Sequence, residues 1–199
     1  MSTVTSRRSL LALALIALAL TIGAVTAWPA CARHEGDEGP AAVDLDLMAF
    51  LSAARALHHQ ANLEEEADRL PKAIDAMDRL VVLKFPHPER KTPEVEEVLA
   101  DAYARLAELQ LKNGDLDRAA AAVDKGLGHV EGVTYFKGHL VEVQGLIEEA
   151  RAARFADAGN AAEASKAREK AIQLLEEVVK IQDQVIKSSL AKDGGGARR

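Results

Sequence analysis

The residues best suited to metal chemistry in this sequence are two adjacent histidines, His58 and His59, which precede an acidic run from Glu64 to Asp68. Imidazole and carboxylate groups are common ligands of divalent cations. Neighbouring side chains on a helix point about 100° apart, however, so these two histidines do not readily share one ion. No pair with metal-ligand spacing is formed by the remaining histidines, which are His34, His87, His129 and His139. An exposed acidic helix face explains the same residues, so we expect no metal site and keep a His/Glu metal-binding accessory protein as an alternative.

Patterns for nucleophilic or phosphate chemistry do not occur in the sequence. Cys31 is the only cysteine, so residues 33–199 contain no thiol. They contain neither a Gly-x-Ser-x-Gly elbow nor a glycine-rich phosphate loop. Acidic pairs such as Glu148-Glu149 and Glu176-Glu177 are typical of solvated helix faces. We therefore expect a protein that is not an enzyme, with no catalytic residue and no cofactor.

Composition favours one all-α domain. The 199 residues are 48% hydrophobic but only 4% aromatic, and alanine and leucine dominate, which argues against a large sheet. Arg7 and Arg8 are the only charged residues before Arg33, so residues 33–199 carry 23 basic and 31 acidic side chains, a net charge of −8. A body this acidic is a poor general binder of nucleic acid or anionic lipid.

Residues 1–32 have the pattern of an export segment. Arg7 and Arg8 precede an uncharged apolar run from Leu10 to Trp28, and acidic residues follow from Glu35. A basic start and an apolar core are typical of a signal peptide. Three outcomes remain open: cleavage near Ala32, retention of the run as a membrane anchor, or lipidation of Cys31. In each case the body is expected in the periplasm or on the outer face of a membrane, with membrane contact only through this segment.

The folded part is expected between flexible ends. Residues 33–44 are charged and contain two glycines and a proline, as a flexible tether would. Residues 191–199 contain three consecutive glycines and are expected to be disordered. The helical domain should therefore span residues 45–190.

Helical stretches in this domain break at a regular interval. Gly114 is expected to end one helix in the left-handed conformation, and Asp115 to cap the next. A second break falls at Gly159, between helices expected at residues 133–157 and from 161 to about 189. A third falls near Asp68, a candidate cap, with Pro71 at the start of the following helix. Breaks 45 and 46 residues apart indicate about three antiparallel helical hairpins.

The middle hairpin contains aromatic, small and turn residues in a characteristic order. They are Tyr103, Leu106, Ala107, Gly114, Asp115, Ala119, Val123 and Gly126. This stretch resembles a tetratricopeptide repeat. Residues 57–83 and 133–189 match less completely, because Gln60, Glu64 and Arg168 stand where the family has apolar or small residues. The resemblance implies a short right-handed solenoid with a long C-terminal helix; a plain bundle of three hairpins is the alternative.

In this family the first helices of successive hairpins line a groove that holds partner peptides. The positions carried over to this chain are Arg55, His58, Asn62 and Glu65 in the first unit, and Asp101, Ala104, Glu108, Leu111 and Lys112 in the second. Because this face is acidic overall, a basic or mixed-charge protein partner suits it best.

The sequence thus predicts an exported, non-catalytic adaptor or scaffold of the cell envelope that binds one or more protein partners. The alternative is a self-associating structural protein. It would form a homodimer through an apolar stripe on the last helix, between Leu174 and Val185 and including Leu175 and Val178.

Overall fold

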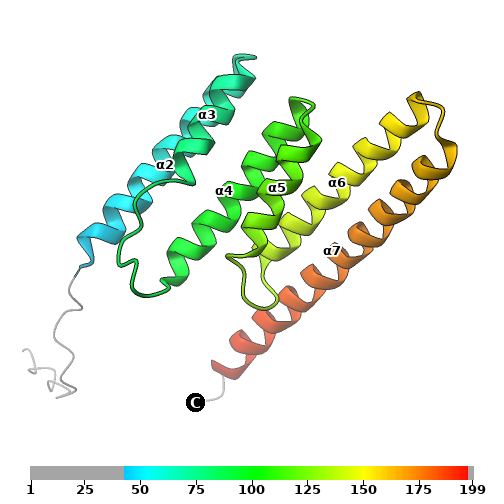
Figure 1. Ribbon diagram of the computed structural model, residues 1–199. Helices are drawn as coiled ribbons and strands as arrows, with labels where there is room; N and C mark the ends of the chain where they lie inside the picture. Colours follow the sequence, from blue (N-terminus) through cyan, green and yellow to red (C-terminus); the bar gives the residue numbers. More distant parts are fainter. Residues whose placement is uncertain (1–42, 197–199) are drawn as a thin grey trace, which may run out of the picture. The chain divides into compact units, whose positions relative to one another are not determined.

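The chain folds into α-helices, as the sequence predicts. The fold is taken from a computed structural model, which describes residues 43–196, and in this range all regular secondary structure is α-helical (Figure 1). The helices are α2 (Leu45–Glu66), α3 (Leu70–Leu80), α4 (Pro93–Lys112), α5 (Leu116–Leu127), α6 (Tyr135–Asp157) and α7 (Ala161–Gly196). Within the described residues, none of these helices has the length and apolar character needed to cross a membrane. The predicted export segment and nearly all of the tether lie outside the described residues, as does the end of the predicted tail.

Three turns with the same hydrogen bonds separate the helices of each pair. Asp68, Gly114 and Gly159 have φ angles of +55°, +82° and +76°. In each turn the amide of this residue donates to the carbonyl three residues earlier, and the next amide donates to the carbonyl five residues before it. This is the Schellman arrangement that satisfies the last carbonyls of a helix. The regular interval read from the sequence therefore reflects one repeated turn.

Asp68 is a correction to the sequence prediction. It does not cap α3, because it is itself the left-handed residue that ends α2. The N-cap of α3 is Arg69, whose side chain makes no capping hydrogen bond, and Pro71 follows in the first turn. Aspartate is a common N-cap and is also one of the few residues that tolerate the left-handed conformation. Its residue type therefore did not distinguish a cap of α3 from the end of α2. Asp115 does cap α5, by accepting a hydrogen bond from the amide of Arg118.

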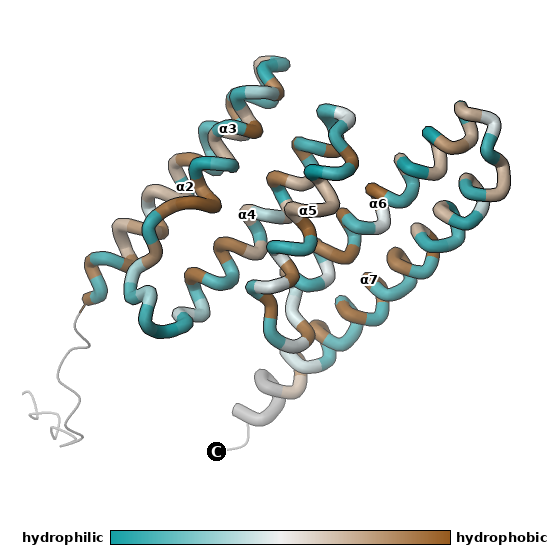
Figure 2. The backbone as a smooth tube through the Cα atoms, in the orientation of Figure 1, coloured by the Kyte–Doolittle hydropathy of each residue, from teal (hydrophilic) through white to brown (hydrophobic). Residues whose placement is uncertain are grey.

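Helix α4 is the centre of the packing. It contacts α2, α3, α5 and α6, whereas α7 contacts only α6 among the described helices. Hydrophobic positions recur along each helix between hydrophilic ones (Figure 2), which lets every helix bury one side. Leu106, Ala107, Ala119, Val123 and Gly126, all part of the tetratricopeptide resemblance, are buried. Helices therefore pack in consecutive pairs around α4; the handedness of a solenoid stays a prediction.

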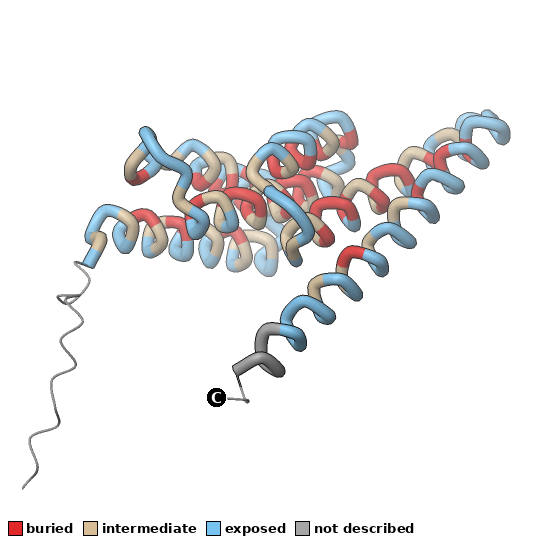
Figure 3. Tube along the Cα trace, turned by 90° about the horizontal axis from the view of Figure 1, so that it is seen from below, coloured by how far each residue is buried: buried red, intermediate tan, exposed pale blue. Residues whose placement is uncertain are grey.

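The last helix differs from its prediction in length and in the face it presents. It continues to Gly196, past the expected boundary at residue 190; Ala191 and Lys192 favour extension of an existing helix, although the three glycines that follow do not. Figure 3 shows α7 exposed over most of its surface. Leu174, Val178 and Val185, from the predicted dimer stripe, are half-buried on the side that faces α6. The predicted stripe is thus mainly an intramolecular contact.

The α5 glycine Gly126 lies at a close approach of three helices. A Cβ atom at Gly126 would lie 2.9 Å from the Tyr103 Cβ of α4 and 2.6 Å from a Leu140 methyl group of α6. We expect Gly126→Ala to destabilise the protein by about 1–2 kcal/mol, because this overlap outweighs the better helix propensity of alanine. The free energy of unfolding, measured in denaturant on the full-length chain, checks the prediction.

Gly138→Ala is the matched control. Its added Cβ would meet the movable amide end of Gln182, so we expect a change within about 1 kcal/mol of zero. Equal losses for the two variants would contradict the packing described for Gly126.

Candidate functional site

A hollow lies between the middle of α2, residues 51–62, and the N-terminal half of α4, and we call it the α2–α4 groove. Its volume is about 640 Å³. Its lining residues are Leu51, Ala54, Arg55, His58, His59, Asn62, Leu80, Glu94, Glu97, Val98, Asp101, Ala102 and Phe136. They come from four helices. α2 forms one wall and α4 the other, and α3 and α6 contribute one residue each, Leu80 and Phe136.

The two walls of the groove differ in charge. The α4 wall carries Glu94, Glu97 and Asp101, which lie at helical spacings of three and four residues and so share one face. The α2 wall carries Arg55 together with His58 and His59. Leu51, Ala54, Val98 and Phe136 add apolar surface between them. The groove therefore offers carboxylates on one side, nitrogen groups on the other and apolar contacts between.

The positions that the sequence analysis assigned to a partner-binding groove lie in different surroundings. Arg55, His58, Asn62 and Asp101 line the α2–α4 groove. Ala104 does not, because it is fully buried in the core, and Leu111 packs against the same core. Because four helices contact α4, less of its surface is exposed than in a helix at the end of the series. The other predicted positions, Glu65, Glu108 and Lys112, belong to a network of ion pairs beside the groove.

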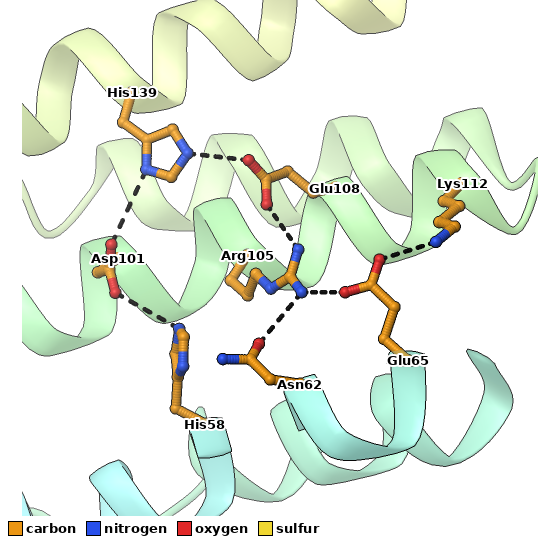
Figure 4. Close-up of polar contacts among 8 residues, drawn as sticks. All are labelled: His58, Asn62, Glu65, Asp101, Arg105, Glu108, Lys112 and His139. Atoms are coloured by element: carbon orange, nitrogen blue, oxygen red, sulfur yellow. Dashed lines mark hydrogen bonds and ion pairs between the residues drawn. The ribbon is translucent and has the colours of Figure 1, made fainter. Parts of the chain in front are cut away.

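Arg105 is the centre of this network (Figure 4). From α4 it donates to Glu65 and, at 3.2 Å, to the Asn62 amide oxygen, both on α2. Its other terminal nitrogen donates to Glu108 at 3.0 Å. Lys112 also donates to Glu65, at 3.0 Å. Arg105 therefore joins the C-terminal half of α2 to α4, next to the place where the groove ends.

His139 extends the network to α6. Its Nε2 lies 3.0 Å from Glu108, and its Nδ1 lies 3.8 Å from Asp101, an ion-pair distance that is too long for a direct hydrogen bond. On the other side, Asp101 lies 3.9 Å from His58 of α2. The polar contacts thus run continuously from α2 through α4 to α6, as Figure 4 shows.

The surroundings of His139 favour its charged form. The carboxylates of Asp101 and Glu108 raise the pKa of His139 to about 9, and their effect exceeds that of burial, which acts in the opposite direction. Burial by itself would raise the pKa of Glu108, but the hydrogen bonds from His139 and Arg105 lower it. Lys112, and then Arg105, lower the pKa of Glu65. These shifts favour the charged forms of Glu65, Glu108 and His139.

Arg105 and His139 are the functional candidates that sequence reasoning missed. One signal for Arg105 was present: His58 and Asp101, and Asn62 and Arg105, are each 43 residues apart, so that these equivalent positions of two units carry complementary polar groups. His139 had no such signal, because its contacts depend on how α6 packs against α4.

The histidines and carboxylates considered for a metal site are not brought together. Glu64 pairs with Arg69, Glu65 with Arg105, and His59 lies at the groove. Among the described residues, no group of three or more His, Cys, Asp or Glu side chains is placed to hold a metal ion.

Arg105→Met tests whether the network stabilises the packing. We expect it to lower the free energy of unfolding by about 2–3 kcal/mol, because Glu65 and Glu108 would keep their partly buried charges with fewer partners. Denaturant unfolding of the full-length chain measures the change.

Arg118→Met makes the same replacement at an exposed ion pair, with Asp78. The Arg118 side chain is 55% exposed and that of Arg105 is 21% exposed, so we expect a loss below about 1 kcal/mol for Arg118. If both variants lost the same small amount, the network would not hold the helices together.

The His139 contacts predict a pH dependence. Because the folded-state pKa of about 9 lies above the ordinary value of 6.5, the stabilisation is complete below pH 6.5 and is lost as the pH rises through 9. We expect His139→Gln to cost roughly 2–3 kcal/mol at the lower end of this window and much less above it. Unfolding of both proteins across the window checks this, and a difference that does not change with pH would contradict it.

Comparisons with known proteins assign no family to the chain. No protein-family model matches the sequence, and no curated protein matches it closely enough to be a relative. The tetratricopeptide resemblance therefore stands on the residues of the middle hairpin alone and stays a prediction.

Proposed function

We propose that this protein is a non-catalytic adaptor that binds a segment of a protein partner in the α2–α4 groove. The observation that carries the proposal is the groove itself, with carboxylates on one wall, basic and imidazole groups on the other and apolar side chains between. Its volume, about 640 Å³, falls in the range of pockets that bind ligands. Four positions that the tetratricopeptide resemblance assigns to partner binding line this groove.

The walls define the chemistry of the partner. A bound segment would direct lysine or arginine side chains toward Glu94, Glu97 and Asp101. An acidic or amide side chain would suit Arg55 on the opposite wall. Small apolar side chains would contact Leu51 and Val98. The partner segment is therefore basic and apolar, and the acidic body of the protein would attract it over a longer range.

The neighbouring ion pairs supply rigidity. Arg105 and His139 fix α4 relative to α2 and α6, so the walls are set before a partner arrives. A preformed site loses less conformational entropy on binding, which leaves more of the contact energy for affinity.

The place of action follows from the N-terminal segment. As an exported protein, the chain would work in the periplasm or on the outer face of a membrane, with residues 1–32 as a removed signal or a retained anchor. The body would bind protein and not nucleic acid, since its net charge is negative.

Capture of partners by the full-length protein tests the proposal. The protein, tagged at its C-terminus, is recovered from the envelope fraction, and co-purifying proteins are quantified by mass spectrometry. Glu94→Lys/Glu97→Lys reverses two exposed charges of the groove and leaves the ion-pair network intact. We expect this variant to recover about tenfold less of a specific partner.

Asp117→Lys/Asp124→Lys is the matched control. It changes the net charge by the same amount, at exposed positions of α5 away from the groove. A partner that both variants lose equally would respond to the net charge of the protein and not to the groove. A partner that the groove variant retains would bind elsewhere. Either result contradicts the proposal.

A further inference from the structure

A stripe of exposed aliphatic side chains runs along the outer side of α7. Between 38% and 69% of the surface of each residue is exposed. Its members, which we call the outer stripe, are Ile172, Leu175, Val179, Ile186 and Leu190. They recur at spacings of three, four and seven residues and therefore lie on one side of the helix. This side is distinct from the face that carries Ala164, Ala167, Ala171 and Ile181, which are buried.

The outer stripe has no partner within the described structure. α7 contacts only α6, and Figure 3 shows most of its described residues exposed. Leu175 lies at the border of the two faces, with its side chain against Gly145 of α6. Large aliphatic residues concentrated on one exposed helix side are typical of an interaction surface.

Two charged residues fit the same line of positions. Arg168 lies four residues before Ile172, and Asp183, which also accepts a hydrogen bond from Lys187 on its own helix, lies four residues after Val179. Arg168 and Asp183 are equally distant from the point between residues 175 and 176, and so are Ile172 and Val179. Reversal about this point therefore matches the cation Arg168 with the anion Asp183 and the aliphatic Ile172 with Val179, while Ile186 and Leu190 fall opposite Ser165 and Ala161.

We propose that the N-terminal part of the outer stripe, from Ile172 to Val179, binds the same part of a second copy of this chain, with the two α7 helices antiparallel about a two-fold axis near Leu175. In this arrangement Ile172 faces Val179 of the second copy, and Arg168 faces its Asp183. A two-fold interface needs such a self-complementary surface. A parallel pair in register would instead place Arg168 against Arg168 and Asp183 against Asp183, which is unfavourable.

This interface differs from the dimer expected from the sequence. The expected stripe, from Leu174 to Val185, included Leu174 and Val178, which face α6. The outer stripe shares Leu175 and Val179 with it and adds Ile172, Ile186 and Leu190. The proposal does not depend on the groove, because α7 contributes no residue to it.

Disulfide cross-linking tests the antiparallel arrangement in cells that express the full-length chain carrying Cys31→Ser. The double variant Arg168→Cys/Asp183→Cys should form a covalent dimer on mild oxidation, because each new cysteine faces the other one across the axis. Each single variant should yield about tenfold less, since its two cysteines would be roughly 22 Å apart in the dimer.

Lys166→Cys/Gln184→Cys is the matched control. These exposed positions have nearly the same midpoint but lie roughly 145° around the helix from the outer stripe. Cross-linking of the stripe pair alone supports the proposal. Three results would overturn it: strong cross-linking of the single variants, equal cross-linking of the control pair, or no cross-linking of the stripe pair. The last result is expected if a membrane or another protein covers the stripe.

A charge exchange provides an independent test with little risk to the fold. We expect Arg168→Glu to raise the dissociation constant of the dimer about tenfold, measured by sedimentation equilibrium of the purified full-length chain. Adding Asp183→Arg should restore it, because opposite charges meet again. Failure of the second change to restore the dimer would overturn the antiparallel pairing, even if Arg168→Glu alone weakened it.

Discussion

The contacts of Arg105 are the constraint on which the arrangement of the first helices depends. This one guanidinium donates to Glu65 and Asn62 of α2 and to Glu108 of its own helix, and Glu108 in turn binds His139 of α6. Partly buried charges lose hydration, and only well-placed partners offset that loss. These charged contacts therefore join α2, α4 and α6 at one set of positions, in addition to the hydrophobic packing between them.

The same contacts divide the space between α2 and α4 into two parts. In the C-terminal half, the ion pairs close the gap between the helices. Before this point, along residues 51–62 of α2 and 94–102 of α4, the gap stays open as the α2–α4 groove, whose walls carry charges of different kinds. The outer stripe of α7 belongs to the opposite end of the helix series. A dimer through that stripe would leave both grooves free and so present two binding sites to a partner, which increases avidity.

Much of the helical architecture could be predicted from residue types that favour one local conformation. Gly114 and Gly159 mark left-handed turns, and the buried positions of the middle hairpin follow helical spacing. Residues that fit two local roles led to errors. Asp68, for example, was expected to cap α3 but is the left-handed residue that ends α2. Contacts between helices could not be predicted from local sequence patterns. Ala104 is buried because α4 is central, and His139 meets Glu108 only because α6 packs on α4. On α7, apolar residues lie on two neighbouring sides, and spacing alone does not tell which side is covered.

The central claim is that a partner segment binds between α2 and α4. Hydrogen exchange of the full-length chain, followed by mass spectrometry with and without a captured partner, tests it most directly, because it locates the bound surface without any substitution. The account predicts that the partner slows exchange in residues 51–62 and 94–101, which form the two walls, and leaves α5 unchanged. Slower exchange confined to α5 or α7, with both walls unchanged, would contradict it.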